Sequence, residues 1–136
     1  MPDRFLQDVI TNLSFQTAWV EIGQYFLRAR PEGKEAPFIR RMLETKQEMI
    51  NQLSRTLRQH DYAPAQVRPD AKLLEQAHKR RTPEAVLRYI HHGLLMSVDW
   101  YHDRLQNQAH PFHELWRSLY NMEMSLKEDV EQVLSS

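Results

Sequence analysis

Apolar residues in the last part of the chain recur at helical spacing with almost no interruption. Between positions 111 and 134 they stand three or four residues apart, at Leu115, Leu119, Met122, Leu126, Val130 and Val133. This spacing places one apolar stripe along a helix, and such regularity is typical of a helix packed in a bundle. A chain with this pattern must supply other helices that cover the stripe.

Three further segments, 3–30, 37–60 and 83–107, carry comparable stripes. These stripes consist of Leu6, Val9, Leu13, Val20 and Leu27; Ile39, Met42, Met49, Leu53 and Leu57; and Leu87, Leu94, Val98, Tyr101 and Leu105. The third segment opens with Thr82 and Pro83, a favourable N-cap followed by a favourable first helical residue. Because alternating β-branched residues are nearly absent, strands are not expected. The sequence predicts an all-α fold.

The lengths of the connections predict how the four helices are joined. The first two segments and the last two are each joined by a short polar loop, so each pair should form an antiparallel hairpin. The 22-residue stretch "DYAPAQVRPDAKLLEQAHKRRT" joins the hairpins and contains a short helix at about 71–79. Helices of about 24 residues are roughly 36 Å long. The connection can therefore cross over along the bundle, and we expect one four-helix-bundle domain over 1–136.

The composition excludes several classes of function. The chain has 18 basic and 18 acidic side chains, a balance that argues against broad binding of nucleic acid or anionic membranes. No cysteine is present, so disulfides and thiolate metal sites are excluded. No run of 18 apolar residues could form a membrane span, and "MPDRFLQDVI" lacks the pattern of a secretory signal. We expect a cytoplasmic protein.

At the level of pattern the chain resembles the ferritin-like superfamily, nearest to its rubrerythrin-like members. The stretch "YFLRARPEGKEAPFIRRMLETKQEMINQL" combines an aromatic pair late in the first helix, a polar turn and an acid-rich second helix. The stretch "WYHDRLQNQAHPFHELWRSLYNMEMSLKEDVEQVL" repeats that layout. The resemblance implies a four-helix bundle with a dinuclear iron or manganese site. That site takes a Glu from each of two helices and a Glu-x-x-His from each of the other two.

The ligands that the resemblance implies are largely missing. Gln16 stands where the first helix should carry its Glu, and the core-facing pair of the second helix is Lys46-x-x-Met49. His91 stands where the third helix should carry a Glu, and Glu123 has no histidine three residues later. We therefore expect no dinuclear site and no cofactor.

Polar side chains on the inward faces predict a core polar layer, made of Gln16, Thr17, Gln24 and Lys46. Lys46 is the unusual member because burying an unpaired ammonium is costly. Two alternatives stay open for it. The side chain could extend to water past the bundle edge, or it could pair with Glu123 and take the place of the metal's charge.

A mononuclear metal site is the alternative to a metal-free core. Its candidate ligands for iron, manganese or zinc are His91, Asp99, His102 and Glu123. His91 and His102 are 11 residues apart, about 16 Å along a helix, so they cannot share one ion. In the plainer interpretation Asp99 orients His102, and a neighbouring side chain satisfies His91.

Two helices carry a second apolar face that one core does not need. These faces consist of Phe15, Trp19, Ile22 and Phe26 in the first helix and of Tyr89, Met96 and Trp100 in the third. The crossover could cover one face and a second subunit the other, since aromatic residues and Met are enriched at interfaces. We therefore expect a non-enzymatic homodimeric interaction or structural protein. The alternatives are a metal-binding or redox protein, and a binder of a small apolar ligand in a core widened by Met42, Met49, Met122 and Tyr101.

Overall fold

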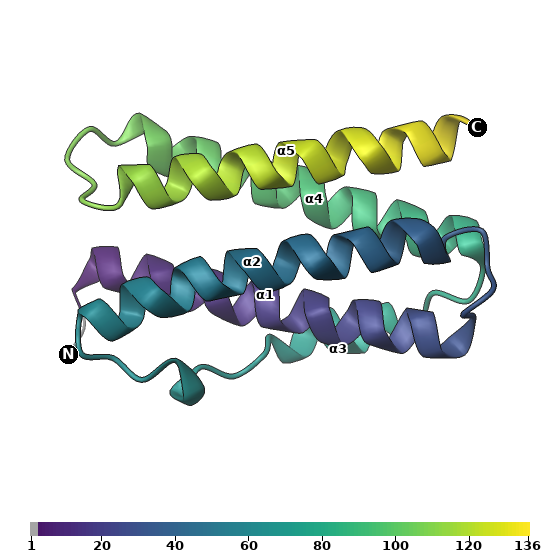
Figure 1. Ribbon diagram of the computed structural model, residues 1–136, viewed down its shortest axis with the longest axis horizontal. Coiled ribbons are helices and arrows are strands. Elements are labelled where there is room, and N and C mark those ends of the chain that lie inside the picture. The colour runs from purple at the N-terminus through teal and green to yellow at the C-terminus, as the bar shows by residue number, and fades with distance from the viewer. Residues whose placement is uncertain (1–2) are drawn as a thin grey trace.

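A computed structural model describes residues 3–136 and contains, within that range, five α-helices, one short 3-10 helix and no strand (Figure 1). In chain order the elements are α1 (Arg4–Ala29), α2 (Ala36–Gln59), η1 (Pro64–Gln66), α3 (Ala71–Ala77), α4 (Pro83–Gln106) and α5 (His113–Ser135). The predicted all-α class is confirmed. Each predicted helix is present, and its ends differ from the predicted ends by no more than two residues.

Side-chain caps explain where three of the helices begin. The carboxylate of Asp3 accepts a hydrogen bond from the Leu6 backbone N–H at 2.8 Å. At the start of α3, the Asp70 carboxylate accepts one from the Leu73 backbone N–H at 3.0 Å. The Thr82 hydroxyl accepts from the Ala85 N–H at 3.1 Å and precedes Pro83, as the sequence predicted. These oxygens satisfy backbone donors that the first turn of a helix leaves without a partner.

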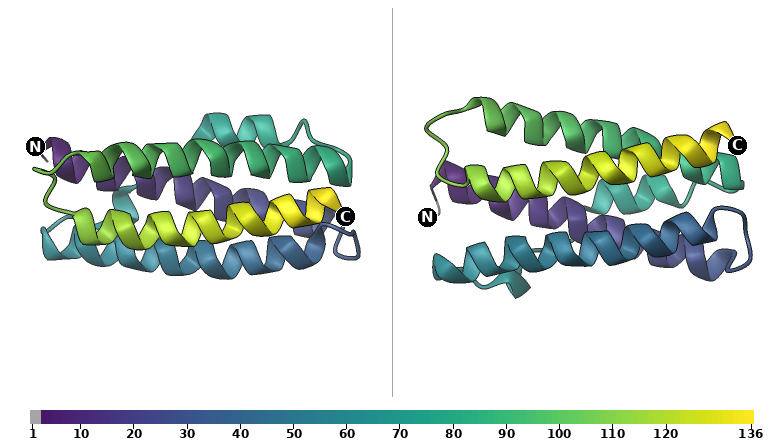
Figure 2. Two further views of the ribbon diagram at one scale, coloured as in Figure 1. Left: turned by 90° about the horizontal axis from the view of Figure 1, so that it is seen from above. Right: turned by 45° about the horizontal axis from the view of Figure 1, so that its top comes forward.

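The four long helices lie side by side (Figures 1 and 2). Helix α1 packs along α2 and α4 packs along α5, while α2 and α5 also contact each other. The connection that follows α2 runs outside α1, and its second half forms α3, which packs on α1. Among the described residues, no helix is both long and apolar enough to cross a membrane.

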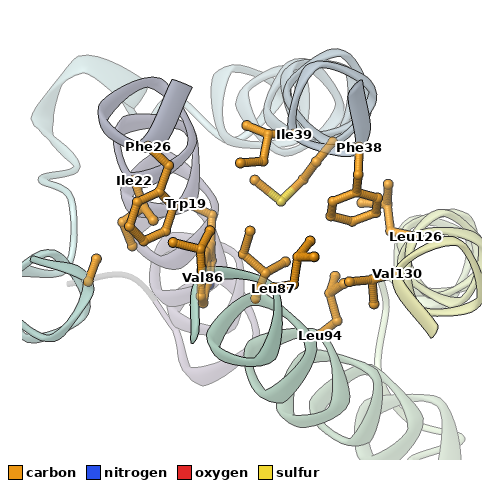
Figure 3. Close-up of a cluster of buried hydrophobic side chains, with 13 residues drawn as sticks. Trp19, Ile22, Phe26, Phe38, Ile39, Val86, Leu87, Leu94, Leu126 and Val130 are labelled. Atoms are coloured by element: carbon orange, nitrogen blue, oxygen red, sulfur yellow. The ribbon is translucent and has the colours of Figure 1, made fainter. Parts of the chain in front are cut away.

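The buried apolar side chains form two separate clusters. The first gathers residues from the helix ends that carry Phe26, Phe38 and Val130, and Figure 3 shows its side chains converging from α1, α2, α4 and α5. The second cluster, at the opposite end of the helices, is built around Tyr101 and Trp116. Three buried polar residues, Gln16, Lys46 and Glu123, lie between the two clusters.

The face of α1 that enters the core differs from the predicted one. Val20 and Leu27 are half-buried, whereas Trp19, Ile22 and Phe26 are buried in the first cluster. The second half of α1 therefore turns a different side to the core, and α3 packs on this part of α1. The prediction that Trp19, Ile22 and Phe26 form a dimer face is therefore wrong.

Helix α3 supplies the cover for this side of the molecule. Its Ala77 is buried in the first cluster, and Leu73 packs against the same cluster. The Tyr89 hydroxyl donates to the Leu73 carbonyl oxygen at 2.8 Å, and the Tyr89 ring lies 5.3 Å from that of Trp19. The expectation that the crossover covers one of the second apolar faces is confirmed for α1, and Tyr89 is covered as well.

Candidate functional site

An ion pair lies among the buried polar residues between the two apolar clusters. The Lys46 ammonium on α2 lies 2.6 Å from Oε1 of Glu123 on α5 and donates to Oε1 of Gln16 on α1 at 2.7 Å. Lys46 and Glu123 are 1% and 0% exposed. Of the two alternatives for Lys46, the structure therefore has the pair with Glu123.

The polar layer continues from Gln16 towards α4. The Gln16 amide donates to the Tyr101 hydroxyl at 3.0 Å, and that hydroxyl donates to Oδ1 of Asn12 at 2.7 Å. The five residues Asn12, Gln16, Lys46, Tyr101 and Glu123 thus form one buried network, which we call the polar layer. Buried polar groups must be paired in this way because desolvation without a partner is costly.

Burial determines the proton affinities in the polar layer. It raises the pKa of Tyr101 well above its ordinary value, and the Glu123 carboxylate adds to this effect. Burial lowers the pKa of Lys46, while the charge of Glu123 and the hydrogen bond to it act in the opposite direction. The second carboxylate oxygen of Glu123 has no hydrogen-bond partner within residues 3–136.

The predicted membership of the polar layer is right for two residues out of four. Gln16 and Lys46 belong to it, Thr17 is half-buried outside it, and Gln24 is exposed. Gln24 lies outside the side that the second half of α1 turns to the core, which carries Trp19, Ile22 and Phe26. Asn12 was missed, although it stands four residues before Gln16 and so shares its helix face.

The four candidate metal ligands do not come together. Asp99 and His102 are exposed on α4, whereas Glu123 is buried beside Lys46. His91 lies 2.9 Å from a carboxylate oxygen of Glu131. Within residues 3–136 no group of three or more His, Asp or Glu side chains is placed to hold a metal ion.

The polar layer also does not fit a dinuclear metal centre. The Lys46 ammonium lies at the Glu123 oxygen that would have to ligate a cation. Its second partner, Gln16, is a neutral amide and adds no negative charge. A dinuclear site needs several carboxylates to neutralise two hard cations. The arrangement is that of a buried salt bridge.

A cavity of about 260 Å³ lies between α1 and α4, on the outer side of the polar layer. Ten residues line it: Thr11, Asn12, Phe15, Gln16, Trp19, Leu73, Gly93, Met96, Ser97 and Trp100. None of them carries a charge at neutral pH. Phe15, Met96 and Trp100 were predicted to form the dimer face, and the structure places all three around this cavity.

Gly93 on α4 leaves room for the Trp19 ring of α1 beside the cavity. A β-carbon at position 93 would lie 2.2 Å from Cζ2 of Trp19, so only glycine leaves room for the Trp19 ring. On the other side of the lining, the Arg104 guanidinium stacks over the Trp100 ring at 3.7 Å from its centroid. Both indoles of the cavity wall are thus held by specific contacts.

A second cavity, of about 310 Å³, lies where α1 and α3 end and α4 begins. Its lining includes four charged residues, Arg30, Glu35, Arg80 and Arg81, and three of these contact other side chains of the protein. Arg30 pairs with Glu35 at 2.6 Å, and the Arg80 guanidinium stacks on the Tyr89 ring. The cavity between α1 and α4 is therefore the better candidate for a binding site.

The chain matches no known protein family, no curated protein and no solved structure.

Proposed function

We propose that this chain is a four-helix bundle with a ferritin-like crossover that binds a small apolar molecule in the cavity between α1 and α4. The packing of α1 on α2, of α4 on α5 and of α2 on α5 supports the bundle. The long connection that contains α3 supports the crossover. The proposed role is binding without catalysis.

The observation that carries the proposal is the composition of the cavity wall. Five large apolar side chains, Phe15, Trp19, Leu73, Met96 and Trp100, line the cavity together with the buried amides of Asn12 and Gln16. Small-molecule sites are typically concave and mostly apolar, with a few polar groups that fix the ligand's orientation. The proposed site differs from the Met-widened core first considered, because Met42 and Met49 are buried and neither lines this cavity.

The core ion pair supports a role without metal chemistry. The Lys46 ammonium already balances the charge of Glu123, so a cation bound at that carboxylate would meet no unpaired negative charge. We expect protein purified without chelator to contain no stoichiometric iron, manganese or zinc. One or two metal ions per chain, with a melting temperature raised by the same metal, would contradict this part of the proposal.

Binding is tested by equilibrium dialysis of the purified chain against naphthalene and against 2-naphthol. Both probes are expected to bind, and Thr11→Phe should abolish binding because Thr11 lines the cavity. The control Thr45→Phe changes a half-buried threonine on α2, outside the lining, and should bind as the wild type does. Failure of both probes to bind the wild-type chain would overturn the proposal, as would unaltered binding by Thr11→Phe.

A homodimer is the second candidate, because α4 also exposes apolar surface. Leu95 and Met96 are 37% and 62% exposed, the two large apolar side chains most open to solvent in the described part of the chain. Aromatic residues and Met at an exposed face are typical of interface cores. A second copy of the chain seated on this face of α4 would bury them.

Substitution of Leu95 tests the dimer separately from the cavity, because Leu95 does not line it. If the chain dimerises through α4, sedimentation should show a dimer for the wild type and a monomer for Leu95→Lys, while probe binding persists. The exposed position His92→Lys on the same helix is the control and should remain dimeric. A monomeric wild type at high concentration would remove this candidate.

A further inference from the structure

The polar residues that line the cavity make only part of their possible hydrogen bonds to other residues of the chain. Both ends of the Gln16 amide are engaged, its oxygen by Lys46 and its nitrogen by Tyr101. The Asn12 oxygen accepts from the Tyr101 hydroxyl, so the group that Asn12 can still offer is its NH2.

Ser97 is another polar residue of the lining with unused capacity. Its hydroxyl oxygen is buried and has no hydrogen-bond partner of ordinary geometry among the described residues. It lies near the Tyr101 hydroxyl and lowers the pKa of that group as a weak hydrogen-bonding neighbour. A serine hydroxyl can donate one hydrogen bond and accept others. A buried hydroxyl without a partner is unfavourable, so a ligand group that pairs with it gains affinity.

The charges around the cavity favour a neutral ligand. No lining residue is charged, and behind Gln16 the Lys46 ammonium is already balanced by Glu123. A charged ligand would give up its hydration without an opposite charge in the lining. Burying an unpaired charge is strongly unfavourable.

The shape of the cavity favours a flat ligand of one or two rings. Its walls include the aromatic rings of Phe15, Trp19 and Trp100, against which a ring can stack. Its volume of about 260 Å³ exceeds the roughly 150 Å³ of an engineered cavity that holds benzene. The cavity therefore has room for a ligand larger than benzene, such as one of two fused rings.

We infer that the cavity between α1 and α4 takes a neutral one- or two-ring aromatic molecule with a hydroxyl group, which Ser97 and Asn12 recognise. A phenolic hydroxyl suits these two residues because it can donate a hydrogen bond to the Ser97 oxygen while it accepts one from the Asn12 NH2. This inference rests on the proposed binding function and adds the chemical class of the ligand.

The test compares the two probes, which differ only in the hydroxyl group. At pH 7, 2-naphthol should bind the wild-type chain about fivefold more tightly than naphthalene, as one net hydrogen bond provides. Ser97→Ala should bring the ratio of the two dissociation constants close to one. The conservative variant Ser97→Thr keeps a hydroxyl and should retain part of the preference.

The outcomes separate this inference from the proposed function. Equal binding of both probes to the wild type would overturn the hydroxyl recognition and leave the binding function intact. A preference that survives in Ser97→Ala would likewise overturn the assignment of Ser97. Tighter binding of the anion 2-naphthoate than of 2-naphthol would overturn the neutral class. Binding of none of the probes would refute the proposed function itself.

Discussion

The ammonium of Lys46 and the carboxylate of Glu123 lie 2.6 Å apart across the contact between α2 and α5, at the junction of the two apolar clusters. Water reaches neither group, so each charge depends on the other for its stabilisation. Such a pair contributes little net stability because desolvation offsets the attraction, but removing one partner leaves a buried unpaired charge. The pair thereby links the hairpin of α1 and α2 to that of α4 and α5.

A double-mutant cycle on this pair should show strong coupling. Lys46→Met and Glu123→Leu are each expected to lower the free energy of unfolding by about 3–5 kcal/mol, whereas the double variant should be near neutral or more stable than the wild type. Denaturant unfolding of the four proteins measures these values. The exposed pair Lys34 and Glu84, 3.5 Å apart, is the matched control. The double-mutant cycle on this control pair should give a coupling free energy of less than about 1 kcal/mol. Additive losses at Lys46 and Glu123 would contradict the pairing.

Replacement of Gly93 by alanine should destabilise the chain, although alanine is the better helix former. The new β-carbon would lie 2.2 Å from the Trp19 ring, and an indole packed in the core cannot move aside easily. We expect a loss of about 1–3 kcal/mol, typical of overpacking, and a shift of the tryptophan emission. Gly23→Ala is the control, because its nearest contact is the flexible end of Leu43 at 2.8 Å. A gain in stability for Gly93→Ala would show that Trp19 does not occupy this place.

The helices of this chain could be predicted closely because their signals are local. Thr82 and Pro83 mark the start of α4, and the polar turn after Ala29 ends α1. Part of the polar layer could also be predicted, since Lys46 stands on an apolar stripe where a lysine needs an explanation. Its partner Glu123 was one of two alternatives, because spacing within one helix does not fix the rotation of the helix that faces it.

The surface around α1 could not be assigned from the sequence for a related reason. Trp19, Ile22 and Phe26 have the spacing of an interface helix, and only the position of α3 shows that the chain itself covers them. The cavity was equally inaccessible, because it depends on how α1 and α4 separate around Trp19 and Gly93. Apolar spacing predicts that a helix face is covered. Which segment of the chain, or which other molecule, covers it depends on the tertiary structure.

Tyr101→Phe should make the chain less sensitive to alkali. Because burial raises the Tyr101 pKa above its unfolded value, the folded chain keeps this proton longer than the unfolded chain does. The resulting stability is fully present below a pH of about 10 and is lost as the pH rises towards the folded pKa. Unfolding free energies between pH 8 and 11 should fall less steeply for Tyr101→Phe. Lys46 titrates in both proteins, so its contribution largely cancels. Parallel curves would contradict the prediction.

The carboxyl group of Glu131 should have a pKa below its ordinary value in the folded chain. The first cause is its hydrogen bond with His91, whose Nε2 lies 2.9 Å away, and the second is that with Lys127. The stability that this shift provides is present above the ordinary pKa and is lost as the pH falls through the folded value. A carbon-detected NMR titration of the wild type and of His91→Phe measures the Glu131 pKa, which should be higher in the variant. His92→Phe changes the exposed neighbour and should leave it unaltered. If both variants shift the Glu131 pKa equally, the contact between His91 and Glu131 does not form in solution.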